Sequence, residues 1–158
     1  MQNLKIRVKD LVEMEEFANK LANYFTDHPA VIFLDGDLGA GKTTFTQFFA
    51  KELGVHEVVT SPTFNLLKRY QGEKRFLNHF DLYRIKENVY HQGFEDYWNN
   101  PDEISIIEWA TYLPNEFKSL FSLHLTIKII NENEREITIL GRNSIISFIK
   151  EECNELIH

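Results

Sequence analysis

Cysteine is almost absent from this sequence of 158 residues. The single copy, Cys153, has no partner for an internal disulfide, and it excludes a metal site built from several thiolates. A lone cysteine is typical of proteins that work in a reducing compartment, so we expect a cytoplasmic protein without disulfides.

Long apolar runs are missing as well. No stretch approaches the roughly 20 apolar residues that a membrane-spanning helix needs, and the opening residues MQNLKIRVKD contain no apolar signal core. We therefore expect a soluble, intracellular protein with no membrane partner.

Basic charge is also scarce. Seventeen Lys and Arg residues against 24 Asp and Glu residues give a formal net charge of −7. Because a domain that binds nucleic acid by itself is usually basic, this balance argues against autonomous binding of RNA or DNA. It leaves open a role beside nucleic acid in which another protein contacts the phosphates.

Hydrophobic residues, in contrast, are plentiful. They make up 43% of the chain and include 13 phenylalanines, which favours a filled interior over a disordered chain. A chain of this length supports one domain with a proper core and is too short for two. We expect residues 1–158 to form a single domain.

A phosphate-binding loop pattern lies near the start of the chain. Residues 36–43 read GDLGAGKT, which matches the spacing G-x-x-x-x-G-K-[ST]. Glycines allow the backbone to turn its N–H groups toward a phosphate, Lys42 would reach the β- and γ-phosphates, and the Thr43 hydroxyl would hold Mg²⁺. The pattern predicts nucleotide binding.

The flanks of this loop have the expected structure. Residues 30–34, AVIFL, form an apolar run typical of a buried parallel strand. After the loop, a helical spacing is shown by Phe45, Phe48, Phe49 and Leu53, and Gly54 follows where a helix would end. Strand, loop and helix therefore occur in the required order.

Two acidic residues follow later apolar strands. Residues 64–70 and 75–83 predict a hairpin whose second strand delivers Asp81, and residues 103–107 predict a strand that delivers Glu108 and Trp109. Carboxylates at the carboxyl ends of strands suit a Mg²⁺ site in the crevice of an α/β sheet. The alternatives are a turn-capping Asp81, a helix-start Glu108 and a packing role for Trp109.

Three hydroxyl groups lie together between the loop and these acids. Thr60, Ser61 and Thr63 surround Pro62, in a segment that senses the γ-phosphate in many phosphate-loop proteins. The alternative is an ordinary Ser-Pro turn.

The remaining segments complete an α/β pattern. We expect an edge strand at 3–9, a helix after Asp10, a short strand at 58–59, helical turns within 85–102, a hairpin formed by 120–130 and 135–140, and a helix capped by Asn143. The predicted apolar face of the first helix comprises Leu11, Met14, Ala18, Leu21 and Phe25. Together these elements predict a P-loop NTPase-like three-layer α/β fold. Its mixed, mostly parallel sheet is flanked by helices and carries an added C-terminal hairpin.

Four stretches together resemble one family. They are GDLGAGKTT at 36–44, TSPTF at 60–64, HFDLYR at 79–84 and IEW at 107–109, and their order and spacing resemble the TsaE (YjeE) family over roughly residues 4–140. The resemblance implies a small bacterial ATPase that binds ATP and Mg²⁺ and hydrolyses ATP slowly. Such proteins act with TsaB and TsaD in making threonylcarbamoyl-adenosine on tRNA, so tRNA would be an indirect partner.

The resemblance also implies roles for particular residues. Asp81 and Glu108 would serve Mg²⁺ and the attacking water with Lys42 as catalytic cation, and Thr43 would be a further metal ligand. One departure concerns Met14, where many members carry a Thr, so any base contact there must differ. The expected nucleotide-binding residues are Gly36, Asp37, Leu38, Gly39, Ala40, Gly41, Lys42, Thr43, Thr44, Thr63, Trp109 and Arg135.

Hydrolysis at such a site is mainly a matter of positioning and electrostatics. The sequence does not single out an arginine finger: Arg84 is one candidate and an arginine of a partner is another. We therefore expect a slow ATPase that a partner accelerates.

Three other functions share the loop. A small-molecule kinase would need an arginine-rich lid, and the basic residues after position 87 form no such cluster. A GTP switch would usually carry an Asn-Lys-x-Asp motif, which is missing here. A non-catalytic adaptor would hold its nucleotide without turnover.

Overall fold

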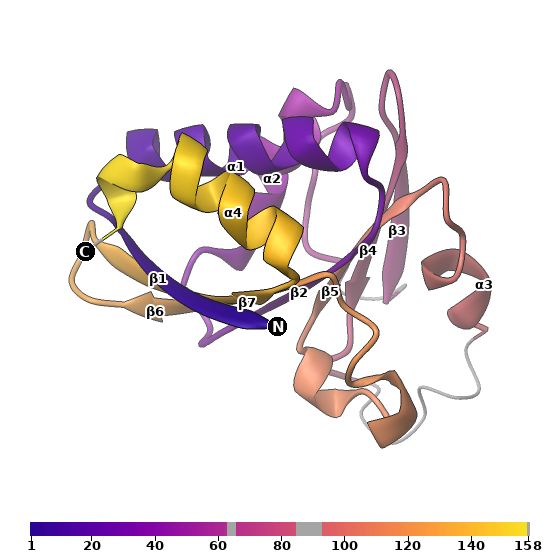
Figure 1. Cartoon of the computed structure of the whole chain (residues 1–158). Helices are drawn as coiled ribbons and strands as arrows, with labels where there is room; N and C mark the ends of the chain where they lie inside the picture. The colour runs from indigo at the N-terminus through magenta and orange to yellow at the C-terminus, as the bar shows by residue number, and fades with distance from the viewer. Residues whose placement is uncertain (63–65, 85–92, 158) are drawn as a thin grey trace.

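The computed structural model describes residues 1–62, 66–84 and 93–157. Its centre is a seven-stranded sheet in the order β1-β7-β6-β2-β5-β4-β3 (Figure 1). The strands are β1 (Gln2–Val8), β2 (Val31–Gly36), β3 (Leu67–Gln71), β4 (Phe76–Asp81), β5 (Ile104–Glu108), β6 (Leu123–Ile129) and β7 (Arg135–Gly141).

Helices and short 3₁₀ turns connect the strands. The α-helices are α1 (Leu11–Asp27), α2 (Lys42–Glu52), α3 (Glu95–Trp98) and α4 (Asn143–Glu152). The 3₁₀ turns are η2 (Ala110–Tyr112), η3 (Asn115–Phe117) and η4 (Asn154–Leu156). In the described part of the chain, no helix is long and apolar enough to cross a membrane.

The strand directions confirm a mixed, mostly parallel sheet. β6, β2, β5 and β4 are parallel neighbours, whereas β7 and β3 run opposite to the other five strands. The β6–β7 hairpin joins the sheet through β6, which pairs with β2, and β1 then closes the edge against β7. The first strand is thus an edge strand, as its alternating pattern predicts.

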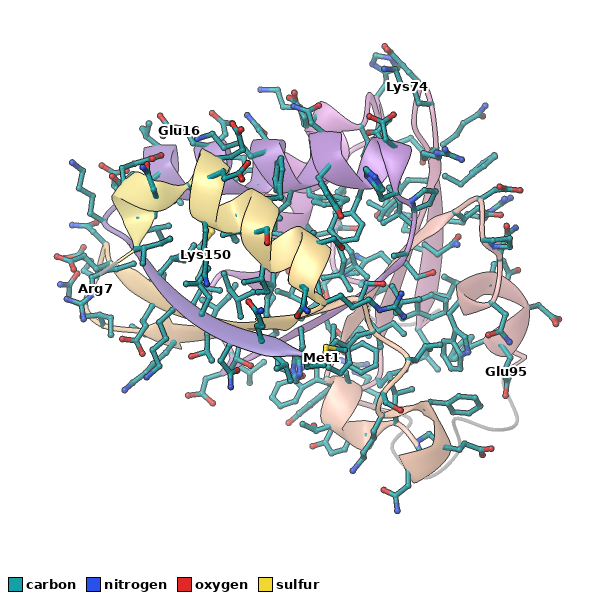
Figure 2. The ribbon with its side chains drawn as sticks, in the orientation of Figure 1. Met1, Arg7, Glu16, Lys74, Glu95 and Lys150 are labelled. Atoms are coloured by element: carbon teal, nitrogen blue, oxygen red, sulfur yellow. The ribbon has the colours of Figure 1, made fainter. Side chains whose placement is uncertain are left out.

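Helices cover the two faces of the sheet unequally. α1, α2 and α4 lie together on one face, and their apolar side chains join Ile32, Leu34 and Ile106 in the larger core (Figure 1). On the other face, Trp98 of α3 packs with Phe80 and other residues of a smaller core. That second layer stops short of β1, whose residues 3, 5 and 7 are exposed. Charged side chains such as those of Glu16 and Lys74 project from the periphery (Figure 2).

Local sequence signals explain α1 and correct two predictions at helix starts. Asp10 caps α1 by accepting a hydrogen bond from the Glu13 backbone N–H at 2.9 Å. Leu11, however, is 66% exposed because it lies in the first turn at the rim of a cavity, so its place on the buried face was wrong. Asn143 is the first residue of α4 rather than its cap, and Arg142 occupies the cap position without a side-chain bond.

Other boundaries shift by a few residues. No strand forms at 58–59. Val58 is exposed, and the Val59 carbonyl accepts a hydrogen bond from the Gln47 side chain instead of from a neighbouring strand. Two predicted segments lie partly outside the described residues: the strand at 64–70 lacks 64–65, and the helical turns within 85–102 lack 85–92. The described parts of those two segments contain β3 and α3. Cys153 is buried, and burial raises the pKa of its thiol to about 11.

Candidate nucleotide site

The phosphate loop lies between β2 and α2, as predicted. Gly36 ends β2 with φ of 153°, and a Cβ atom there would lie 2.6 Å from the Ile127 carbonyl oxygen, so only glycine fits. Gly41 precedes α2 in the left-handed region, with φ of 110°. These two glycines turn the chain so that the N-terminus of α2 faces the loop.

Lys42 is buried at the first position of α2. Its ammonium donates hydrogen bonds to the backbone carbonyls of Gly36 and, at 3.1 Å, of Asp37. The same ammonium lies 4.8 Å from the centre of the Trp109 ring, which is a cation–π distance. The lysine is therefore held by its own loop and covered by an indole.

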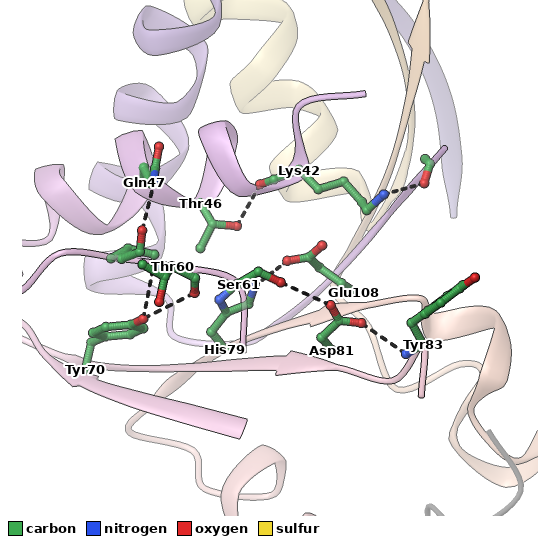
Figure 3. A network of polar contacts seen from close by, with 12 residues as sticks. Lys42, Thr46, Gln47, Thr60, Ser61, Tyr70, His79, Asp81, Tyr83 and Glu108 are labelled. Atoms are coloured by element: carbon green, nitrogen blue, oxygen red, sulfur yellow. Dashed lines mark hydrogen bonds and ion pairs between the residues drawn. The ribbon is translucent and has the colours of Figure 1, made fainter. Parts of the chain in front are cut away.

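The two acidic residues meet at the carboxyl ends of adjacent strands. Asp81 of β4 and Glu108 of β5 are directly paired in the sheet. Asp81 accepts hydrogen bonds from the Tyr83 backbone N–H at 3.0 Å and the Ser61 hydroxyl at 3.4 Å. Ser61, Asp81 and Glu108 lie close together beside the start of α2 (Figure 3). The bond from Tyr83 makes Asp81 a turn cap, as the alternative predicted, and the sheet register also places its carboxyl beside Glu108.

Glu108 has a buried partner to which the sequence motifs assign no role. The Nε2 atom of His79 donates to Oε2 of Glu108, since an ionised carboxylate can only accept. Nδ1 of His79 has no hydrogen-bond partner among the described residues. His79 and Asp81 occupy alternate positions of β4, so a period-two pattern was the one signal that could have placed both side chains on this face.

The environment of Asp81 disfavours its ionised form. Burial raises the pKa of this carboxyl above its usual value of 3.8, and the nearby Glu108 carboxylate raises it further. The bond from Tyr83, the charge of His79 and the Ser61 hydroxyl oppose the rise without cancelling it. Two carboxylates held this close favour a bound cation, which would offset both effects.

We expect Asp81→Asn to stabilise the nucleotide-free protein at neutral pH. A carboxyl whose pKa is raised in the folded state retains its proton longer there, so wild-type stability falls as pH rises above 3.8. Asparagine keeps an oxygen for the Tyr83 N–H and avoids that loss. Thermal unfolding should therefore give a higher Tm for the variant than for the wild type at pH 7, and a smaller difference in Tm near pH 4. The exposed Asp102→Asn, which changes net charge equally, is the control. A gap independent of pH would contradict the assignment.

A cavity of about 260 Å³ connects the loop to the acids. Lys42, Thr43, both acidic residues and Trp109 are among the residues that line it. Among the described residues, its lining comprises Leu38, Gly39, Gly41, Lys42, Thr43, Thr44, Ser61, Asp81, Glu108 and Trp109. Thr63 lies outside the described residues.

A second cavity, of about 230 Å³, adjoins the other side of the loop. Its lining shares Gly39, Gly41 and Thr44 with the first cavity. Val8 and Met14 form its apolar wall. The remaining lining residues are Asp10, Leu11, Ala40, Glu132, Asn133 and Arg135. The loop therefore separates a polar, carboxylate-lined cavity from a partly apolar one.

Arg135 supports the loop from the second cavity. Its Nε donates to the Ala40 carbonyl at 2.9 Å, and its Nη1 donates to the Asn131 carbonyl at 2.8 Å. Arg84, in contrast, lines a neighbouring cavity of about 200 Å³ together with Pro62 and Tyr83. The structure thus brings Arg135 to the phosphate loop and places Arg84 beside the acidic cavity.

Comparison with known proteins identifies a family. A family model described as "Threonylcarbamoyl adenosine biosynthesis protein TsaE" matches residues 8–138. The chain belongs to the TsaE family. The match spans the phosphate loop, both acids and Arg135, so all the elements of the candidate site lie inside the family region.

Individual members of the family resemble the chain along most of its length. The tRNA threonylcarbamoyladenosine biosynthesis protein TsaE of Bacillus subtilis is 36% identical, covering 98% of this chain and 96% of that protein. Its counterpart from Rickettsia prowazekii is 33% identical, covering 87% and 94%. The crystal structure of Bacillus subtilis YdiB superposes with a TM-score of 0.73 at 31% identity, covering 98% and 96%.

Proposed function

We propose that this TsaE-family chain is a single-domain, Mg²⁺-dependent ATPase that serves threonylcarbamoyl-adenosine biosynthesis on tRNA. The observation that carries the proposal is the pair of cavities that share the phosphate loop. One offers carboxylates and a lysine, and the other offers apolar side chains. A nucleotide laid across the loop would match both.

The second cavity suits the base and sugar of ATP. Met14 and Val8 line this cavity although they are largely buried, at 4% and 1% exposed, so they would form an apolar floor for a flat ring. Glu132, Asn133 and Arg135 add polar groups at the same cavity. Met14 therefore supplies a packing contact at the position where many family members have a hydroxyl.

The donor set of the first cavity suits Mg²⁺. The Thr43 hydroxyl and the Asp81 and Glu108 carboxylates are the oxygen ligands that this ion prefers, and Mg²⁺ usually completes its shell with water and phosphate oxygens. The described residues contain no cluster of three or more His, Cys, Asp or Glu that could hold a metal ion. A bound Mg²⁺ would neutralise charge on the phosphate oxygens.

Different groups of the protein would then bind the γ-phosphate and orient the attacking water. Lys42 uses two of its three ammonium donors on the carbonyls of Gly36 and Asp37 and would offer its charge to a γ-phosphate, while the N-terminus of α2 faces the same charge. Glu108 would accept a hydrogen bond from the attacking water and orient it. His79 fixes one oxygen of that carboxylate and leaves the other available. Catalysis of this kind depends on positioning and electrostatics.

The pathway assignment follows from family membership. Relatives from Bacillus subtilis and Rickettsia prowazekii carry the name tRNA threonylcarbamoyladenosine biosynthesis protein. We propose that the chain acts in the cytoplasm with TsaB and TsaD, and that tRNA is reached through those partners. The net charge of −7 supports an indirect contact with tRNA.

Lys42→Ala tests the ATPase. We expect Mg²⁺-dependent ATP hydrolysis to fall by roughly 10²- to 10³-fold, the usual effect of removing one group that stabilises developing charge. Release of inorganic phosphate by wild type and variant is the measurement, with Lys74→Ala as the control because Lys74 lies at the molecule's periphery (Figure 2). Hydrolysis that survives in Lys42→Ala, or proceeds equally without Mg²⁺, would refute the proposal.

A further inference from the structure

Asp35 and His124 form a polar pair that the proposed chemistry does not use. Asp35 precedes the phosphate loop at the end of β2 and is 8% exposed. Its Oδ2 accepts a hydrogen bond from Nε2 of His124 on the neighbouring strand β6 at 2.7 Å. Its Oδ1 accepts from the backbone N–H of Ala110 at 3.1 Å. The carboxylate therefore links three separate elements.

The bond to Ala110 fixes an unusual piece of backbone. Trp109, immediately before Ala110, has φ of 56° and ψ of 43°, the left-handed region that bulky residues rarely adopt. Such a conformation persists only where surrounding contacts determine it. Asp35 provides one such contact, because the N–H that it binds belongs to the peptide bond between Trp109 and Ala110.

The consequence of this conformation is the position of the indole. Trp109 lies over the Lys42 ammonium at 4.8 Å and packs against the rings of Tyr83 and Tyr112, at 4.9 and 6.0 Å. If the Ala110 N–H were released, the backbone could leave the left-handed region and the indole would move away from Lys42. Asp35 would thus determine whether the Trp109 indole covers the Lys42 ammonium.

His124 keeps the carboxylate in the required orientation. Its ring packs edge-on against Phe33 and Phe121, with centroid distances of 5.7 and 5.4 Å. Phe33 and Phe121 also contact each other, at 5.0 Å, so the imidazole packs against a pair of rings and is a positioned donor that favours one rotamer of Asp35. In that rotamer the second carboxylate oxygen faces Ala110.

We propose that Asp35, oriented by His124, is a positioning residue that sets the left-handed Trp109 turn and holds the indole over Lys42. Its importance for hydrolysis rests on the proposed function. The positioning itself is a property of the nucleotide-free protein and is measured without nucleotide. Failure of one proposal is therefore distinguishable from failure of the other.

Fluorine NMR of the full chain labelled with 5-fluorotryptophan tests this role. The sequence contains two tryptophans, so Trp109 and Trp98 give one resonance each, assigned with Trp98→Phe. Asp35→Ala should shift or broaden the Trp109 resonance and leave that of the buried Trp98 in place. Asp35→Asn should restore the wild-type position, because its amide oxygen still accepts from Ala110 while its NH2 donates to the other neutral tautomer of His124. His124→Ala should produce a smaller change than Asp35→Ala.

Asn100→Ala is the matched control for loss of a side-chain acceptor. Asn100 accepts a hydrogen bond from the Asp102 backbone N–H at 2.9 Å, next to β5 but at the opposite end from Trp109. It should leave the Trp109 resonance unchanged. An unchanged resonance in Asp35→Ala, or equal disturbance in Asp35→Asn, would overturn the proposal. If Asp35→Ala does not fold, His124→Ala decides, and an unchanged Trp109 resonance there would overturn it.

Discussion

TsaB and TsaD should accelerate ATP hydrolysis by this chain by roughly 10³- to 10⁵-fold, if they supply an arginine in trans. Among the described residues that line the carboxylate cavity, Lys42 is the single cation. Its ammonium already donates hydrogen bonds to the carbonyls of Gly36 and Asp37. The site is thus short of positive charge for a developing phosphate anion, and a partner's guanidinium would supply it.

The measurement is steady-state phosphate release with Mg²⁺ and ATP. Rates would be compared for the chain alone, with saturating TsaB and TsaD, and with those partners plus substrate tRNA. Arg84→Ala distinguishes an arginine supplied by this chain from one supplied by a partner, because Arg84 lines the cavity beside the acids. Acceleration that survives in Arg84→Ala supports a partner arginine, and its loss assigns that role to Arg84. A rate indifferent to both partners would contradict the expectation of partner control.

Glu108→Gln should lower kcat by roughly 10²- to 10⁴-fold, the range typical of a lost general base or water-orienting group. KM for ATP should change little. Glutamine has the same shape, and its amide oxygen can still accept the hydrogen bond from His79. The buried pair therefore stays satisfied while the negative charge is lost. Such a split between kcat and KM is expected when an interaction is made mainly in the transition state.

Glu103→Gln provides a matched control for that variant. Glu103 precedes the same strand, at the end far from the loop, where it pairs with Arg69 at 2.8 Å. Its hydrolysis rate should match wild type, and fluorescence titration with an ATP analogue should give similar affinity for all three proteins. An equal loss of Mg²⁺-ATP affinity and turnover in Glu108→Gln would instead make Glu108 chiefly a metal ligand.

Much of the fold was predictable because its signals are local. The glycine spacing before Lys42 and the Asp10 cap depend on backbone conformation within a few residues, so they can be recognised in sequence. Asp81 and Glu108 were placed correctly at strand ends by the same reasoning. Leu11 was misplaced because helical periodicity specifies a face, whereas exposure depends on what packs against that face.

Sequence alone determined the nucleotide-binding loop, the strand–loop–helix order and the two acidic strand ends. Tertiary structure decided which groups meet. His79 reaches Glu108 across 29 positions, His124 reaches Asp35 across 89, and Arg135 reaches Ala40 across 95. Each contact depends on strand order and register in the sheet, which no local pattern specifies. The sequence motifs therefore identify the residues of the candidate site, while the pairing of distant strands determines its geometry.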